Sequence, residues 1–104
     1  MHFSLNPYFI RKIRSDGSTY RSDTVTVKYV ETDDYRYSPV ISKKQGNAVK
    51  RNRVKRIIRH VMTSKKCVYP RGLYFIYVNK DCALIDYPMI LDELNNITKK
   101  ISVR

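Results

Sequence analysis

The chain has 104 residues, of which 42% are hydrophobic, with only three Gly and four Pro. This composition excludes a disordered tail, and the length predicts a single domain over residues 1–104 with little room for a deep active site. The 21 Lys and Arg residues exceed the nine Asp and Glu residues and give a formal net charge of +12, which predicts an anionic partner because such an excess repels itself in a folded protein.

The first predicted element is a short helix that begins at Asn6-Pro7, an N-cap followed by Pro at the first helical position, and ends at Asp16-Gly17. Phe9 and Ile13 are four residues apart, so they share one face of this helix. That face either packs against the core or lines a site for single-stranded nucleic acid, and the pattern leaves both interpretations open.

A strand is predicted over residues 23–31, DTVTVKYVE, because apolar and polar residues alternate there. Its valines at positions 25 and 27 share one face, whereas Thr26 and Lys28 lie on the other. The polar face, beside the first helix, is a candidate surface for single-stranded nucleic acid. Residues 18–21 are compatible with a further short strand.

Two more strands are predicted downstream. Residues 32–34 are a turn, so residues 35–42 are expected to pair with the preceding strand as an antiparallel hairpin. Pro39 lacks a backbone N–H, which places its strand at a sheet edge or a bulge. Residues 73–79, LYFIYVN, are dense in aromatic and β-branched side chains and predict a central strand.

A long helix is predicted from about Ala48 to Ser64, begun by Gly46-Asn47. Its apolar residues follow the i, i+3, i+4, i+7, i+8 spacing of a core-facing stripe: Val54, Ile57, Ile58, Val61 and Met62. The opposite face is almost entirely cationic and carries Asn52, Arg53, Arg56 and Arg59, with Lys55 and His60 beside them.

The last predicted element is a helix that begins at Tyr87-Pro88, with a core face made of Met89, Ile90, Leu91, Leu94, Ile97 and Ile101. The order is therefore helix, strand, strand, helix, strand, helix. This order predicts an α+β fold, a single-domain α-β sandwich with a mixed or antiparallel sheet of about four strands and three helices.

The positive charge is concentrated in one stretch, since residues 35–80 contain no acidic residue but 13 of the 21 basic ones. A solvated helix face usually mixes both signs, so the pattern favours a polyanion partner and predicts RNA. Arginine binds phosphate through two N–H groups, lysine adds charge, and Asn52 can reach a ribose hydroxyl or a base edge. The helix N-terminus at Gly46-Asn47 also favours phosphate. The predicted RNA-binding residues are Lys43, Lys44, Asn47, Lys50, Arg51, Asn52, Arg53, Lys55, Arg56 and Arg59.

No arrangement of residues supports catalysis by the protein itself, so no catalytic residue, metal ligand or protein-bound cofactor is predicted. Cys67 and Cys82 match no metal or disulfide spacing and are expected to be reduced thiols of a cytoplasmic protein. Neither a signal-peptide pattern nor a stretch of about 20 apolar residues is found, and no membrane association is expected.

Residues 42–59, SKKQGNAVKRNRVKRIIR, closely resemble the signature of the bacterial ribonuclease P protein family, Lys-Lys-x-Gly-Asn-Ala-Val-x-Arg-Asn-Arg-x-Lys-Arg-x-x-Arg. The length, charge and element order of the chain also resemble the family. The resemblance implies a sandwich like that of a ribosomal small-subunit protein, with a left-handed crossover around the long helix. The handedness comes from the family alone, because the default for such a crossover is right-handed.

The resemblance also implies a function. In this family a catalytic RNA subunit, which requires magnesium, cuts the 5′ leader from precursor tRNA. The protein binds that RNA and the leader, so the implied partners are these two RNAs, and no protein partner is predicted. Position by position, the basic helix residues match the surface that faces the catalytic RNA. The implied leader-binding residues are Phe9, Ile13, Thr26 and Lys28.

Two other functions remain open from the residues alone. The first is a structural RNA-binding protein of the ribosomal type with no processing role. The second is a DNA-binding protein with the long helix in a major groove. The second is the weaker hypothesis, because the segment from Lys50 to Arg59 offers few base-reading side chains besides Asn52 and the arginines.

Overall fold

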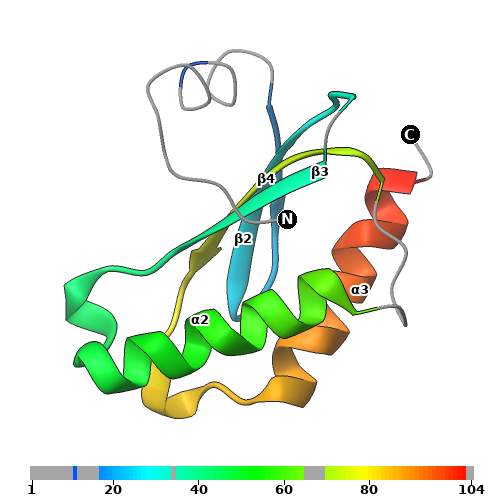
Figure 1. Ribbon diagram of the computed structural model, residues 1–104. Helices are drawn as coiled ribbons and strands as arrows, with labels where there is room; N and C mark the ends of the chain where they lie inside the picture. The colour runs from blue at the N-terminus through cyan, green and yellow to red at the C-terminus, as the bar shows by residue number, and fades with distance from the viewer. Residues whose placement is uncertain (1–10, 12–16, 34, 65–69, 103–104) are drawn as a thin grey trace.

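The computed structural model describes residues 11, 17–33, 35–64 and 70–102 (Figure 1). Within them a four-stranded sheet carries two α-helices on one of its faces. The strands are β1 (Ser18–Arg21), β2 (Val25–Val30), β3 (Tyr35–Val40) and β4 (Gly72–Val78). The helices are α2 (Ala48–Thr63) and α3 (Tyr87–Ser102), with short 3-10 turns η1 (Lys43–Gln45) and η2 (Cys82–Leu84) before them.

The sheet is mixed, with the strand order β1-β2-β4-β3. β2 is antiparallel to both β1 and β4, whereas β3 is parallel to β4. The expected hairpin between β2 and β3 is therefore wrong, because β4 lies between them. The short strand at residues 18–21 is confirmed, and Pro39 lies, as expected, in an edge strand, where its missing N–H removes no hydrogen bond from the centre of the sheet.

The main core lies between the sheet and the helices. α2 buries Val54, Ile58, Val61 and Met62, which confirms the predicted apolar stripe, and Ile57 packs partly buried beside them. From α3, Ile90, Leu94, Ile97 and Ile101 are buried in the same cluster, while Met89 and Leu91 are only half-buried. The sheet contributes alternate residues of β2 and β4, such as Val27 and Ile76.

The other face of the sheet carries a second, smaller cluster. Val30, Leu73 and Phe75 are buried there, and Tyr77 packs against them. Because consecutive residues of β4 enter the two clusters alternately, this strand is apolar on both faces, as a central strand must be. The prediction that residues 73–79 form the central strand is confirmed.

The structure does not test every prediction about the fold. The predicted helix near the N-terminus, with Phe9 and Ile13, lies outside the described residues, as does Cys67. The left-handed crossover and the likeness to a ribosomal protein stay predictions. Cys82 is free and fully buried at η2, just beyond β4, and this burial raises the pKa of its thiol.

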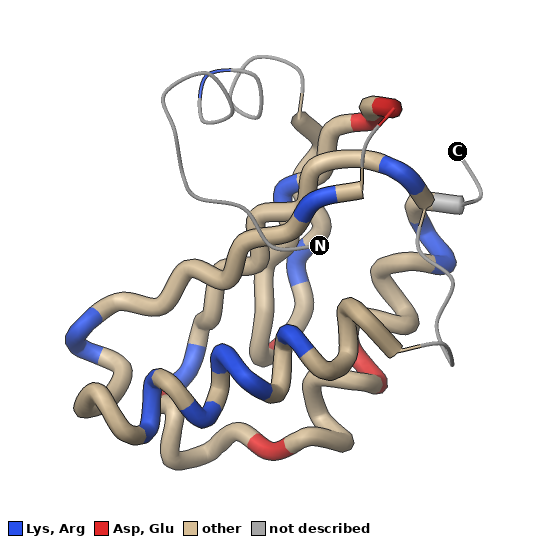
Figure 2. Tube along the Cα trace, in the orientation of Figure 1, with Lys and Arg blue, Asp and Glu red and all other residues tan. Residues whose placement is uncertain are grey.

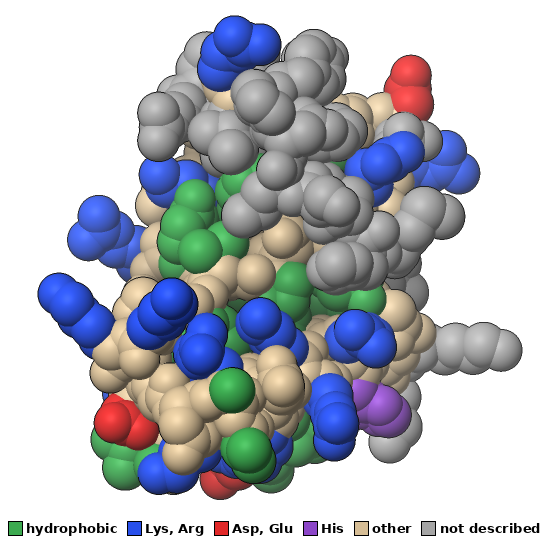
Figure 3. All heavy atoms as spheres, turned by 60° about the vertical axis from the view of Figure 1, so that its left-hand side comes forward, with side chains coloured by type: hydrophobic (Ala, Val, Ile, Leu, Met, Phe, Trp, Pro, Cys, Tyr) green, Lys and Arg blue, Asp and Glu red, His purple; other side chains and the backbone are tan. Residues whose placement is uncertain are grey.

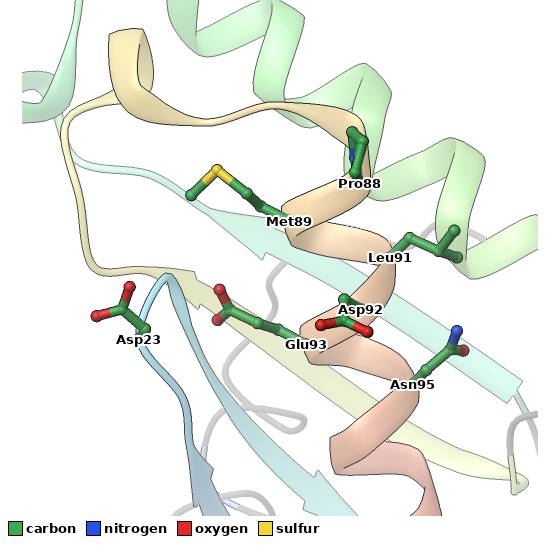
Figure 4. Close-up of a pocket in the computed structure, with 7 residues that line it drawn as sticks. All are labelled: Asp23, Pro88, Met89, Leu91, Asp92, Glu93 and Asn95. Carbon is green, nitrogen blue, oxygen red and sulfur yellow. The ribbon is translucent and has the colours of Figure 1, made fainter.

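Glu93 of α3 fastens the helix to the turn between β1 and β2. Its carboxylate accepts hydrogen bonds from the Ser22 hydroxyl and from the backbone N–H groups of Thr24 (2.7 Å) and Val25 (3.3 Å). Figure 4 shows Glu93 reaching from α3 toward the turn that carries Asp23, beside an open pocket of about 550 Å³. Burial alone would raise the pKa of Glu93, but the hydrogen bonds outweigh it and lower the pKa.

This contact predicts acid sensitivity. Because the folded state lowers the pKa of Glu93, its stabilising effect is complete above the unfolded-state value near 4.5 and is lost as the pH falls through the lower folded-state value. We expect Glu93→Gln to lower the free energy of unfolding at neutral pH by about 2 kcal/mol and to flatten its decline below pH 4.5. Urea unfolding at a series of pH values measures both effects. Asp92→Asn, at an exposed neighbour, is the control and should keep the decline of the parent protein.

Candidate nucleic-acid interface

The N-terminus of α2 is held by Asn47. Its side-chain oxygen accepts a hydrogen bond from the backbone N–H of Lys50 (2.9 Å), and its own carbonyl accepts one from Arg51 N–H (2.9 Å). Asn is a preferred residue for this capping role because it satisfies an N–H group that the helix itself leaves unpaired. Asn47 is thus a structural cap at an exposed helix end, in addition to its predicted role in RNA binding.

Two of the predicted RNA-binding arginines also hold the local structure together. Arg51 is half-buried and donates from Nε to the carbonyl of Gly46 (3.0 Å). Arg53 donates from Nη2 to the carbonyls of Cys82 and Ile85, both at 2.7 Å. Arg53 therefore fixes η2 against α2. This role could not be predicted from the helical pattern, because the acceptors are backbone atoms about 30 positions away.

The Arg53 contacts carry a stability prediction. We expect Arg53→Ala to lower the free energy of unfolding by about 2 kcal/mol, because two carbonyls at η2 lose a charged donor. Arg56→Ala, at an exposed position of the same helix, should change stability by less than about 0.5 kcal/mol. Urea denaturation of both variants makes the comparison, and equal losses would contradict the structural role of Arg53.

The remaining cations of α2 and η1 face outward. Along the trace, Lys and Arg positions follow α2 and its approach (Figure 2), and in the space-filling view their side chains form a band across the lower part of one face (Figure 3). Lys55 is half-buried, and the exposed predicted residues are Lys43, Lys44, Lys50, Asn52, Arg56 and Arg59. We call these seven residues together the α2 surface. The predicted cationic face is thus brought together on one side of the molecule.

The other two described candidates, Thr26 and Lys28, lie elsewhere. They project from β2 on the sheet face opposite the helices. The Thr26 hydroxyl is hydrogen-bonded to the Asn79 side chain (2.9 and 3.2 Å), and the Lys28 ammonium lies 5.5 Å from the centre of the Tyr77 ring, a cation–π contact. Sequence analysis missed Tyr77 and Asn79, whose position beside β2 depends on the pairing of β4.

The described residues were also compared with the requirements of a metal site. No group of three His, Cys, Asp or Glu side chains in this part of the chain comes together as a metal site would require. His60 of α2 instead contacts the ring of Tyr87 edge-on, with 5.2 Å between the ring centres. No helix that the structure describes combines the length and apolar character needed to cross a membrane.

Comparison with known protein families shows to which family this chain belongs. The family model for ribonuclease P matches residues 6–102. This chain belongs to the ribonuclease P protein family. The family signature at residues 42–59 therefore lies on η1 and α2, and most of its cationic side chains are on the α2 surface.

Individual members of the ribonuclease P protein family are moderately similar. The protein component of Petrotoga mobilis is 30% identical over 91 residues, covering 82% of this chain and 77% of its own. That of Streptococcus agalactiae is 32% identical over 89 residues, covering 84% and 82%. The Coprothermobacter proteolyticus protein is 35% identical over 65 residues, but that match spans 62% of this chain and only 55% of the relative's length.

Solved structures of ribonuclease P proteins share the fold. The Thermotoga maritima protein superposes with a TM-score of 0.81 at 23% identity, covering 96% of both chains. The Staphylococcus aureus protein superposes with a TM-score of 0.79 at 24% identity, covering 97% of this chain and 94% of that one. The mixed four-stranded sheet with helices on one face is therefore the architecture of this family.

Proposed function

We propose that this chain is the protein subunit of a ribonuclease P and assists removal of the 5′ leader from precursor tRNA. The observation that carries the proposal is the α2 surface, which presents the family signature as a band of outward cations. In this proposal a partner RNA subunit performs the cleavage and holds the magnesium it needs. The protein contributes no catalytic residue and no cofactor, and it acts in the cytoplasm without a protein or membrane partner.

The α2 surface suits the backbone of a folded RNA. Guanidinium groups bind phosphate oxygens through paired N–H groups, and the ammonium groups of Lys43, Lys44 and Lys50 add charge without a fixed direction. Asn52 is exposed among them and supplies both a donor and an acceptor for a ribose hydroxyl. Binding of this kind is largely independent of base sequence and weakens as salt rises.

The leader is proposed to bind a separate surface on the opposite face of the sheet. Thr26 and Lys28 belong to it, and Phe9 and Ile13 are assigned to it by the family resemblance alone. Lys28 supplies a charge for the leader backbone, and its neighbour Tyr77 supplies an aromatic ring. In this proposal the protein binds the RNA subunit and the leader at the same time, because α2 covers one face of the sheet and the side chains of Thr26 and Lys28 project from the other.

The test of this function is cleavage of a precursor tRNA by the cognate RNA subunit at low magnesium, with and without the purified protein. We expect the protein to raise the rate of leader removal and to bind that RNA in a salt-sensitive manner. No change in rate together with no such binding would overturn the proposal. Association with ribosomal subunits instead of the small catalytic RNA would favour the ribosomal alternative, and a preference for duplex DNA would favour the third.

A further inference from the structure

A small cavity of about 100 Å³ lies between the edge strand β3 and helix α2, lined by Tyr37, Pro39, Lys55 and Arg59. Tyr37 and Pro39 pair with Tyr74 and Ile76 of β4 and are two residues apart, so both project toward the helices. Lys55 and Arg59 are four residues apart on α2 and therefore extend along the same side of the helix. We call this cavity the β3–α2 pocket.

The electrostatics of the β3–α2 pocket favour an anion. Its lining contains two cations and no carboxylate. Burial raises the pKa of Tyr37, and the charge of Arg59, which lines the same cavity, partly opposes that shift. Tyr37 therefore stays neutral, so none of the described residues that line the cavity neutralises the two cations. Partial enclosure by β3 strengthens the attraction between these cations and an anion that enters, compared with the open helix face.

The size of the cavity limits what can enter it. At a liquid volume of roughly 30 Å³ per water, it holds about three waters. That is room for one phosphate group but not for a whole nucleotide. Pro39 and the buried ring of Tyr37 make an apolar wall, so the polar contacts come from the helix side.

We propose that the β3–α2 pocket binds a single phosphate group of an RNA chain, with Lys55 and Arg59 as its cationic ligands. The proposal deepens the function proposed above and rests on it, because it makes one part of the α2 surface a discrete enclosed site. The phosphate is either the terminal phosphate of a chain end or an internal phosphodiester, since both present the same anionic oxygens to the two cations.

The test uses the whole protein and inorganic phosphate, followed by the backbone amide resonances in NMR. At constant ionic strength we expect saturable shifts at Tyr37, Ser38 and Arg59 that chloride does not produce. Lys55→Gln and Arg59→Gln should each weaken phosphate binding about tenfold. Lys99→Gln is the matched control, because Lys99 is exposed on α3, outside both the pocket and the α2 surface. Thermal unfolding establishes that each variant is folded.

Two RNA oligonucleotides of one sequence, with a 5′-phosphate or a 5′-hydroxyl, separate the two sources. Shifts at the pocket with the phosphorylated chain alone assign a terminal phosphate, and equal shifts with both assign an internal one. The proposal is overturned if phosphate produces no saturable shift at the pocket, or if Lys99→Gln weakens binding as much as Arg59→Gln. Salt-sensitive binding of the cognate RNA would then still stand, so failure of the pocket is distinguishable from failure of the proposed function.

Discussion

Gly72→Ala is expected to lower the free energy of unfolding by about 3 kcal/mol and the melting temperature by about 12 °C. A Cβ atom at this position would lie 2.4 Å from Cε1 of Tyr29 and 2.5 Å from the carbonyl oxygen of Val30. The oxygen belongs to the backbone of a paired strand, and the ring is held by the Tyr29 hydroxyl, which donates to the carbonyl of Arg71 at 2.6 Å. Neither neighbour can move aside cheaply.

Gly46→Ala is the matched control for Gly72→Ala. The two glycines have almost the same φ, 159° and 156°, so the comparison separates steric overlap from backbone conformation. At Gly46 the added carbon would lie 3.2 Å from Cβ of Cys82 and 3.3 Å from Cβ of Lys50, which is tight but not prohibitive. We expect a loss of about 1 kcal/mol there. Equal losses in calorimetry would show that the close approach at Tyr29 is not what requires glycine.

The paired substitution of Lys50 and Arg56 by Gln is expected to weaken binding of the RNA subunit at least about tenfold and to reduce the slope of log affinity against log salt by about 1.5. Both side chains are exposed on α2 and outside the β3–α2 pocket. When a phosphate contact is lost, fewer counterions are released from the RNA on binding. The slope of log affinity against log salt is therefore smaller. Fluorescence anisotropy across a series of KCl concentrations gives affinity and slope together.

Lys99 and Lys100 provide the control for that pair. Both residues are exposed near the end of α3. Replacing both by Gln removes two positive charges, the same number as in the Lys50 and Arg56 variant. If the α2 surface is the interface, this variant should keep the parent slope. The same reduction in both variants would mean that net charge alone drives binding, and the assignment of the interface to α2 would fail.

The local features of the fold could be predicted because their signals are local. The stripe of Val54, Ile58 and Val61 specifies α2, and the uninterrupted apolar run of β4 specifies a strand buried on both faces. The partner of β3 could not be predicted in this way. Residues 32–34 suit a tight turn, but turn chemistry says nothing about a strand 40 residues later that occupies the place beside β2.

The candidate interface shows the same division. Which cations share the outer face of α2 follows from helical periodicity. That Arg53 bonds to the carbonyls of η2, and that Tyr77 lies beside Lys28, depends on contacts between segments distant in sequence. The β3–α2 pocket was also inaccessible to sequence analysis, because its wall comes from the parallel pairing of β3 that the hairpin expectation excluded.

The central place of β4 has a consequence for how the chain is made. β2 can pair with β1 early in synthesis, but its second neighbour and the only neighbour of β3 within the described sheet is β4, which ends at Val78. When the first two-thirds of the chain have been synthesised, the nascent chain therefore contains the basic helix and three strands, but the sheet is incomplete because β4 is missing. Because long-range strand pairing is slow, the cationic segment is exposed to cellular RNA before the core exists. The order of the strands therefore delays completion of the core until β4 has been made, after the cationic helix α2.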